Sequence, residues 1–202
     1  TEMRTGWNIF ISIVSVNAYT ATRVFAVGLL TNNTLTGYYA IAERIANAFQ
    51  TFPLESFSQA IYPRLNSIFA KNKKRALKLM KKLQSSISII FMLVIPAAII
   101  LSPFIVKIIC GREYSQVTSS LRLLLVGVLL VVMNVFRIQF LLVSGRPKEY
   151  SQIHIKAAVI GLPLIFISIF YFSYLGAAIS TVLIEAGVLL ATLKISRDAN
   201  LT

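Results

Sequence analysis

ISIIFMLVIPAAIILSPFIV, the stretch from Ile87 to Val106, has no charged side chain along its twenty residues. A bilayer core about 30 Å thick is crossed by ~20 helical residues, so this stretch predicts a membrane-spanning helix. The whole chain of 202 residues agrees, because 56% of it is hydrophobic and 13% charged, against ~45–50% and ~25% in soluble domains. That composition excludes an ordinary soluble enzyme and a disordered chain.

Five further stretches of similar length predict an all-α polytopic membrane protein, with one six-helix transmembrane bundle covering residues 1–202. The six predicted spans are 7–30, 37–65, 87–106, 123–143, 157–174 and 176–193. The second span is the most polar and contains Pro53, which predicts a kink. The chain begins with Thr1 rather than Met, and we expect it to be a piece of a longer protein.

The net charge of +13 is compatible with nucleic acid, an acidic substrate or an anionic membrane surface. Six spans place both termini on one side of the membrane. Twelve Lys or Arg residues fall on that side, against three (Lys107, Arg112 and Arg122) on the other. Because cytoplasmic loops are enriched in Lys and Arg, both ends of the chain are predicted to be cytoplasmic.

Residues 70–83, AKNKKRALKLMKKL, form a basic run in the longest predicted cytoplasmic loop. On a helix its basic side chains fall within an arc of ~120°, and its apolar side chains occupy another arc. This pattern is typical of a cytoplasmic amphipathic helix that meets anionic lipids at the membrane surface. Nucleic-acid binding is disfavoured, since interleaved aromatic residues and a recognisable fold are missing. The basic set is Lys71, Lys74, Arg75, Lys78, Lys81 and Lys82.

Polar side chains share one face of several spans, although an ionisable group at the bilayer centre costs at least ~2.5–3.5 kcal/mol. Two interpretations remain open. The residues can pair with one another, with Glu43 or Glu55 neutralising an arginine. They can instead line a water-filled pathway, which we favour for the set because pairing alone does not require seven polar residues on one helix face. The faces contain Asn8, Ser12, Ser15, Tyr19, Thr22 and Arg23; Glu43, Asn47, Gln50, Thr51, Glu55, Ser58 and Tyr62, with Arg44 at the edge; Asn134 and Arg137; and Thr181, Glu185 and Thr192.

No motif predicts covalent or hydrolytic chemistry. The single Cys110 cannot form an intrachain disulfide, and His154 has no Cys or His at metal-ligand spacing, so we expect no metal and no cofactor. A Gly-rich phosphate loop is missing. Glu43 and Glu55 lie more than three helical turns apart and form no catalytic pair, so we expect the chain not to be an enzyme.

Four segments resemble the bacterial polysaccharide flippases, the O-antigen translocases. GYYAIAERI (37–45) with PLESFSQAIYPRL (53–65) resembles the eighth helix of that family, and GREY (111–114) resembles the loop into its tenth helix. SGRPK (144–148) and LGAA (175–178) are similar to its last cytoplasmic loop and last hairpin. The segments follow the family's order and cover nearly the whole chain.

The resemblance implies a member of the multidrug/oligosaccharidyl-lipid/polysaccharide exporter superfamily, in which two six-helix bundles surround a central cavity. This chain would be the second bundle, and an N-terminal six-helix half would be its partner. The implied substrate is an oligosaccharide on undecaprenyl pyrophosphate. The transporter would flip it across the bacterial inner membrane by alternating access, for O-antigen or other surface polysaccharide. The polysaccharide polymerase and ligase are further expected partners.

Such a substrate requires a polar, cationic cavity, because its headgroup cannot cross hydrocarbon. Guanidinium groups suit phosphate oxygens, so Arg23, Arg44 and Arg137 are the candidates for binding the pyrophosphate. Glu43, Glu55 and Glu185 are candidates for carrying a coupling proton or cation. The candidates for binding sugar hydroxyls are Tyr19, Asn47, Gln50, Asn134 and Gln139.

Other functions remain open. A small-molecule/cation antiporter of the same superfamily would use the same helices. A structural subunit of a polysaccharide assembly complex would depend on the basic run rather than on the polar faces. An enzyme acting on lipid-linked sugar would lack a long periplasmic loop for its chemistry.

Overall fold

The computed structural model describes residues 2–111 and 114–198, and this part of the chain forms seven α-helices and no strand. Within it, the side chains of residues 2, 4–5, 52–58, 60, 62, 140 and 197–198 are not described. The all-α prediction is therefore confirmed. The helices are α1 (Glu2–Leu30), α2 (Asn33–Lys71), α3 (Lys73–Cys110), α4 (Ser115–Val132), α5 (Val135–Val143), α6 (Pro147–Phe172) and α7 (Tyr174–Asp198).

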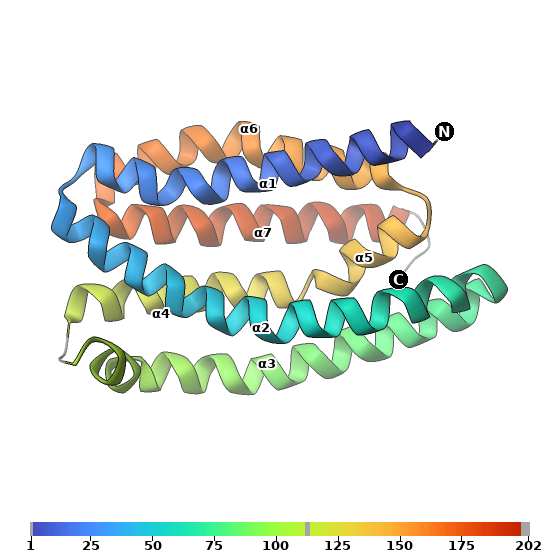
Figure 1. The fold of residues 1–202 in the computed structure, drawn as a ribbon, viewed down its shortest axis with the longest axis horizontal. Coiled ribbons are helices and arrows are strands. Elements are labelled where there is room, and N and C mark those ends of the chain that lie inside the picture. Colours follow the sequence, from blue (N-terminus) through green and yellow to red (C-terminus); the bar gives the residue numbers. More distant parts are fainter. Residues whose placement is uncertain (1, 112–113, 199–202) are drawn as a thin grey trace.

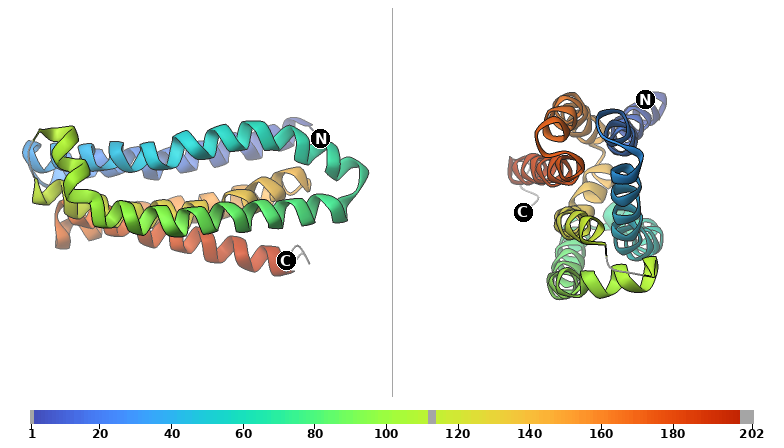
Figure 2. Two further views of the ribbon diagram at one scale, coloured as in Figure 1. Left: turned by 90° about the horizontal axis from the view of Figure 1, so that it is seen from below. Right: turned by 90° about the vertical axis from the view of Figure 1, so that its left-hand side faces the viewer.

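The helices run back and forth along one axis, with α4 and α5 following each other in the same direction (Figure 1). The described chain ends lie at one end of the bundle, together with the α2–α3 and α5–α6 connections. Helix α1 packs along α6, while α4 contacts α2, α3 and α7. An end-on view shows α4 and α5 near the middle, between α2 and α7 (Figure 2).

Within the described residues, five helices are long and apolar enough to cross a membrane: α1 over Gly6–Leu30, α3, α4, α6, and α7 over Tyr174–Ser196. Their outward faces carry large apolar side chains, such as Leu93 of α3 and Phe170 of α6, which are 72% and 76% exposed. A soluble protein would bury these residues, so they are suited to lipid. Helix α2 does not reach the hydropathy of the other five, and the six-span prediction is therefore not confirmed for it.

The predicted span 123–143 is not one continuous helix, because Met133 and Asn134 form a turn between α4 and α5. Gln84 of α3 bonds to both sides of this break. Its Nε2 donates to the Val132 carbonyl at 3.0 Å, and its Oε1 accepts from the Phe136 amide at 3.2 Å. A buried side chain thus replaces helical hydrogen bonds, which is how a broken helix is tolerated at membrane depth.

The basic run 70–83 is not a separate helix at the membrane surface. Asn72 ends α2 and caps α3, its side chain accepting from the Arg75 amide at 3.0 Å, and α3 then continues without a break into the apolar stretch. The apolar side of the run packs inside the protein rather than on lipid, since Ala76 and Met80 are buried in the core. The run therefore forms the second arm of a helical hairpin that projects beyond the other helices (Figure 1).

The reversal between α6 and α7 depends on Gly176. A Cβ atom at this position would collide with the Ser168 carbonyl of α6, so only glycine allows the two helices to approach this closely. The tight turn holds α7 beside α6 along their length.

Candidate functional site

A buried ion pair joins α1 to α2. Arg23 Nε and Glu43 Oε1 are 3.8 Å apart, and the two side chains are 9% and 17% exposed. The Tyr39 hydroxyl, one turn before Glu43, donates to the same carboxylate at 3.4 Å. Arg23 also reaches α7, because its Nη1 donates to Thr181 Oγ1 at 2.6 Å. One guanidinium therefore connects three helices.

Tyr19 and Glu185 extend this group along α1 and α7. Tyr19 lies one turn before Arg23 and is buried, and Glu185 lies one turn after Thr181 and is half-buried. The charge of Arg23 acts on both of them. Of the two carboxylates in this region, Glu43 forms the ion pair with Arg23. We call this set the central polar cluster: Tyr19, Arg23, Tyr39, Glu43, Thr181 and Glu185.

The central polar cluster has an unused hydrogen-bond donor. Among the described residues, Arg23 Nε makes no hydrogen bond although it is buried. The ion pair with Glu43 is longer than a hydrogen-bonded contact. Attraction at this depth is strong because the surrounding dielectric is low, but the contact is loose enough for either partner to be replaced.

A second polar group lies at the break between α4 and α5. Asn134 is 2% exposed, and its Nδ2 donates to Thr192 Oγ1 of α7 at 3.3 Å. Arg137 is half-buried, and its Nη1 donates to the Met133 carbonyl. Thr192 is eleven residues, or ~16 Å, further along α7 than Thr181, so this group is distinct from the central polar cluster.

The outward face of α2 is polar where the other long helices are apolar. Arg44, Asn47 and Thr51 are exposed and recur at helical spacing, and Gln50 beside them is half-buried. A polar face on a membrane helix requires water or a protein partner, since lipid solvates neither guanidinium nor amide groups. We call Arg44, Asn47 and Thr51 the α2 polar face.

The structure thus divides the candidates predicted from the sequence. Arg23 and Glu43 pair with each other, which is the first of the two interpretations left open, whereas Arg44 and Asn47 face outward. Gln139 is half-buried in α5. Glu55 lies outside the described side chains. All six members of the basic set are exposed, namely Lys71, Lys74, Arg75, Lys78, Lys81 and Lys82.

Sequence reasoning missed Tyr39 and Gln84. Tyr39 precedes Glu43 by four residues, a spacing that puts both on one helix face, and this signal was available. Gln84 gave no signal, because its partners Val132 and Phe136 are 48 and 52 residues away in sequence. In the described part of the chain no group of three His, Cys, Asp or Glu side chains is placed to hold a metal ion.

Comparison with known proteins finds a family match over more than half of the chain. Residues 2–119 match the family described as "Polysaccharide biosynthesis protein". A protein of Escherichia coli (strain K12) named "Putative O-antigen transporter" is 31% identical over 200 residues, which cover 97% of this chain and 47% of that protein. A Shigella dysenteriae protein of the same name is 24% identical over 195 residues, covering 96% and 48%.

The chain therefore spans about half the length of the curated relatives that it matches. No solved structure matches it.

Proposed function

Because the chain belongs to the polysaccharide biosynthesis protein family, we propose that it is the C-terminal six-helix half of a flippase for lipid-linked oligosaccharide. The substrate class would be an oligosaccharide on undecaprenyl pyrophosphate, moved across the bacterial inner membrane for O-antigen or related surface polysaccharide. Relatives that carry the name of O-antigen transporters support this proposal. The N-terminal half would supply the opposite wall of the cavity.

The observation that carries the proposal is the α2 polar face. Its exposed Arg44 and Asn47 are out of place against lipid but suited to a hydrated cavity between two bundles. A guanidinium can bind a pyrophosphate through paired hydrogen bonds, while amide and hydroxyl groups meet sugar hydroxyls. With this face turned toward the cavity, α2 crosses the membrane as a sixth span, shielded from lipid on its polar side.

The central polar cluster supplies a coupling element in this proposal. Arg23 is bonded to Thr181 of α7 and paired with Glu43 of α2, and Glu185 lies one turn after Thr181 on α7. A proton or cation that neutralised Glu43 would release Arg23 toward Glu185. Since these residues lie on different helices, the exchange would move α2 relative to α7, as alternating access requires.

The basic arm of the α2–α3 hairpin fits the cytoplasmic side. Its exposed Lys and Arg side chains would meet anionic headgroups of the inner leaflet, and they bias the orientation so that both ends of this chain are cytoplasmic. The hairpin also offers a surface for the polymerase or ligase of polysaccharide assembly.

Replacing Arg44 by Ala in the complete protein tests the assignment. We expect surface polysaccharide to fall at least ~10-fold, because a hydrogen bond to a charged group contributes ~1.5–3 kcal/mol and ~1.4 kcal/mol is tenfold. Arg64→Ala is the matched control, because Arg64 is also an exposed arginine of α2 but lies nearer the end that bears the termini. Protein level and membrane insertion are measured by immunoblot of the membrane fraction. Full polysaccharide in Arg44→Ala cells would remove the α2 polar face from the pathway.

A small-molecule/cation antiporter is the second candidate, favoured by the carboxylate of Glu43, which pairs with Arg23 inside the bundle. Accumulation of a fluorescent cationic dye distinguishes the two. Cells that express the complete protein would exclude the dye if it is an antiporter, and would take it up like the empty vector if it flips oligosaccharide.

A further inference from the structure

A groove between α6 and α7 opens on the outside of the bundle. It has a volume of about 480 Å³, within the ~300–1,000 Å³ of small-ligand sites. Gly161 and Gly187 contribute no side chain to it, and Ile153, Ile184 and Val188 form its buried floor. The central polar cluster and the α2 polar face contribute none of its lining residues.

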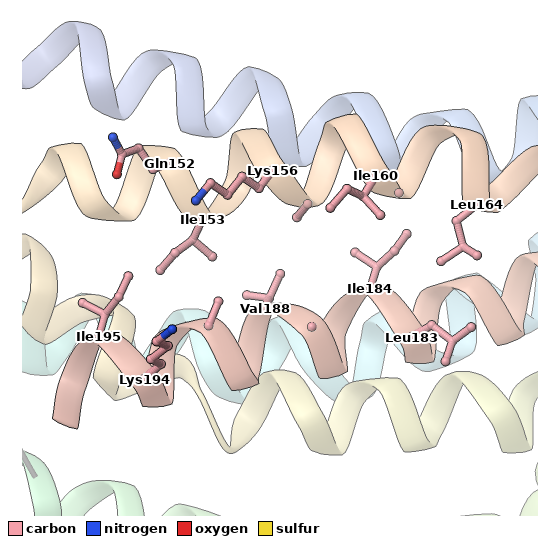
Figure 3. Close-up of a pocket in the computed structure, with 14 residues that line it drawn as sticks. Gln152, Ile153, Lys156, Ile160, Leu164, Leu183, Ile184, Val188, Lys194 and Ile195 are labelled. Atoms are coloured by element: carbon pink, nitrogen blue, oxygen red, sulfur yellow. The ribbon is translucent and has the colours of Figure 1, made fainter. Parts of the chain in front are cut away.

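The groove is cationic at one end and apolar at the other. Gln152, Lys156 and Lys194 gather at one end in Figure 3, while Leu164 and Leu183 lie at the other. Lys156 and Lys194 come from different helices and are both exposed. Neither lysine forms an ion pair with any side chain that the structure describes. Two lysines from different helices therefore line the same end of an apolar slot, and no described side chain pairs with either of them.

The surroundings of the groove are suited to lipid rather than to water. The neighbouring outward side chains on α6 and α7 are large and apolar, including Val159, Ile160 and Leu190, which are 66%, 68% and 67% exposed. No outward polar face like that of α2 borders the slot. The cationic end lies toward the end of the bundle that holds the chain termini, where α6 begins and α7 ends.

We propose that this groove binds one anionic phospholipid of the surrounding bilayer, with an acyl chain along Ile160 and Leu164 and the phosphate between Lys156 and Lys194. Long lysine side chains place their ammonium groups at the headgroup level while their stems stay in apolar surroundings. The lipid would fill the open space beside Gly187, whereas Gly161 lets Ile184 of α7 pack directly on α6. The site is independent of the proposed transport pathway.

The test uses the complete protein, purified in detergent and stripped of lipid, with lipids bound to it counted by native mass spectrometry. The probes are dioleoyl phosphatidylglycerol, dioleoyl phosphatidylcholine and undecaprenyl phosphate. We expect one equivalent of phosphatidylglycerol to be retained, ~10-fold more tightly than phosphatidylcholine, because two lysines meet the anionic headgroup.

Two pairs of variants locate the binding. The double variant Lys156→Gln/Lys194→Gln removes the charges, and its control Lys107→Gln/Lys148→Gln removes two exposed lysines that do not line the groove. Gly187→Leu fills the slot, and its control Gly37→Leu adds the same side chain to α2. A Cβ atom at Gly187 or Gly37 meets nothing within 4 Å, so both positions have room for the start of a side chain.

The proposal requires that Lys156→Gln/Lys194→Gln and Gly187→Leu lose the retained phosphatidylglycerol while both controls keep it. Three results overturn it. Equal retention by all variants places the lipid elsewhere. Stronger retention of undecaprenyl phosphate assigns the groove to a polyprenyl lipid. No retention by the unaltered protein means that another part of the complete protein covers the groove.

Discussion

Arg23 is a charged residue inside a bundle of apolar helices, and its energy depends on partners from two other helices. Glu43 neutralises it and Thr181 accepts one of its hydrogen bonds. Removing both charges of such a pair is often close to neutral, whereas removing one leaves a buried charge without compensation. The pair therefore fixes the relative positions of α1, α2 and α7 more than it adds net stability.

Glu43→Gln leaves the shape of the side chain and removes its charge. We expect it to destabilise the complete protein by on the order of 3 kcal/mol, measured as a lower midpoint of thermal unfolding in detergent. The double variant Glu43→Gln/Arg23→Met regains most of the loss, because no isolated charge remains. Losses that simply add in the double variant would contradict the pairing.

The exposed pair Arg146–Glu149 provides the control. Its atoms are 3.3 Å apart, but its side chains are 39% and 36% exposed. Glu149→Gln should cost at most ~1 kcal/mol, since water screens the interaction.

The residues of this ion pair were predictable from the sequence, but their pairing was not. The sequence identified Arg23 and Glu43 as polar residues at membrane depth and left several acid–arginine pairings open. Which acid pairs with which arginine depends on how α1 and α2 are rotated about their axes. The periodicity within each helix does not specify that rotation. Thr181 is 158 residues from Arg23, so their contact could not be predicted from local sequence either.

At the scale of elements, the break between α4 and α5 is the feature that most departs from expectation. Met133-Asn134 contains neither Pro nor Gly, and the flanking residues are apolar, so the pattern predicted one continuous span. The decisive group is Gln84 of α3, which bonds to the Val132 carbonyl and the Phe136 amide. A helix boundary set by another helix cannot be read from its own sequence.

Gln84→Leu should therefore loosen this break. Each buried backbone group left without a partner costs ~1–3 kcal/mol, so we expect a lower unfolding midpoint and faster hydrogen exchange at the Phe136 amide. Gln59→Leu, a change at an exposed glutamine of α2, is the control and should change neither quantity. Unchanged protection of Phe136 in Gln84→Leu would show that the break closes without the side chain.

The order of the long apolar elements was predictable, because length and hydropathy follow from the bilayer itself. The basic arm of α3 was identified from its composition, but the sequence did not show that it continues in one helix with the apolar stretch 87–106. The same amphipathic pattern is expected for a helix that lies on lipid and for a helix that packs on a neighbouring helix. At 38 residues, α3 is ~57 Å long, so it can cross the ~30 Å core and still extend beyond it.

At the scale of the whole molecule, the antiparallel helices predict which connections face each side of the membrane. The α1–α2 connection and the α2–α3 turn lie at opposite ends of the bundle (Figure 1). In a Cys110→Ser background, Asn33→Cys should react with a membrane-impermeant maleimide in intact spheroplasts, and Lys73→Cys only after permeabilisation. Both positions are exposed.

Leu125→Cys, at a fully buried position of α4, is the negative control and should stay unlabelled in both conditions. Labelling of Lys73→Cys from outside would reverse the orientation. Labelling of both cysteines from one side would mean that α2 does not cross the membrane.

The polarity of α2 also bears on how the protein enters the membrane during synthesis. A helix with an exposed arginine and amide partitions poorly from the translocon into lipid by itself. Helix α1 emerges first and carries Arg23, the counter-ion of Glu43. Once the two helices meet, their opposite charges are neutralised in one step, so α1 and α2 are suited to leave the translocon together as a hairpin.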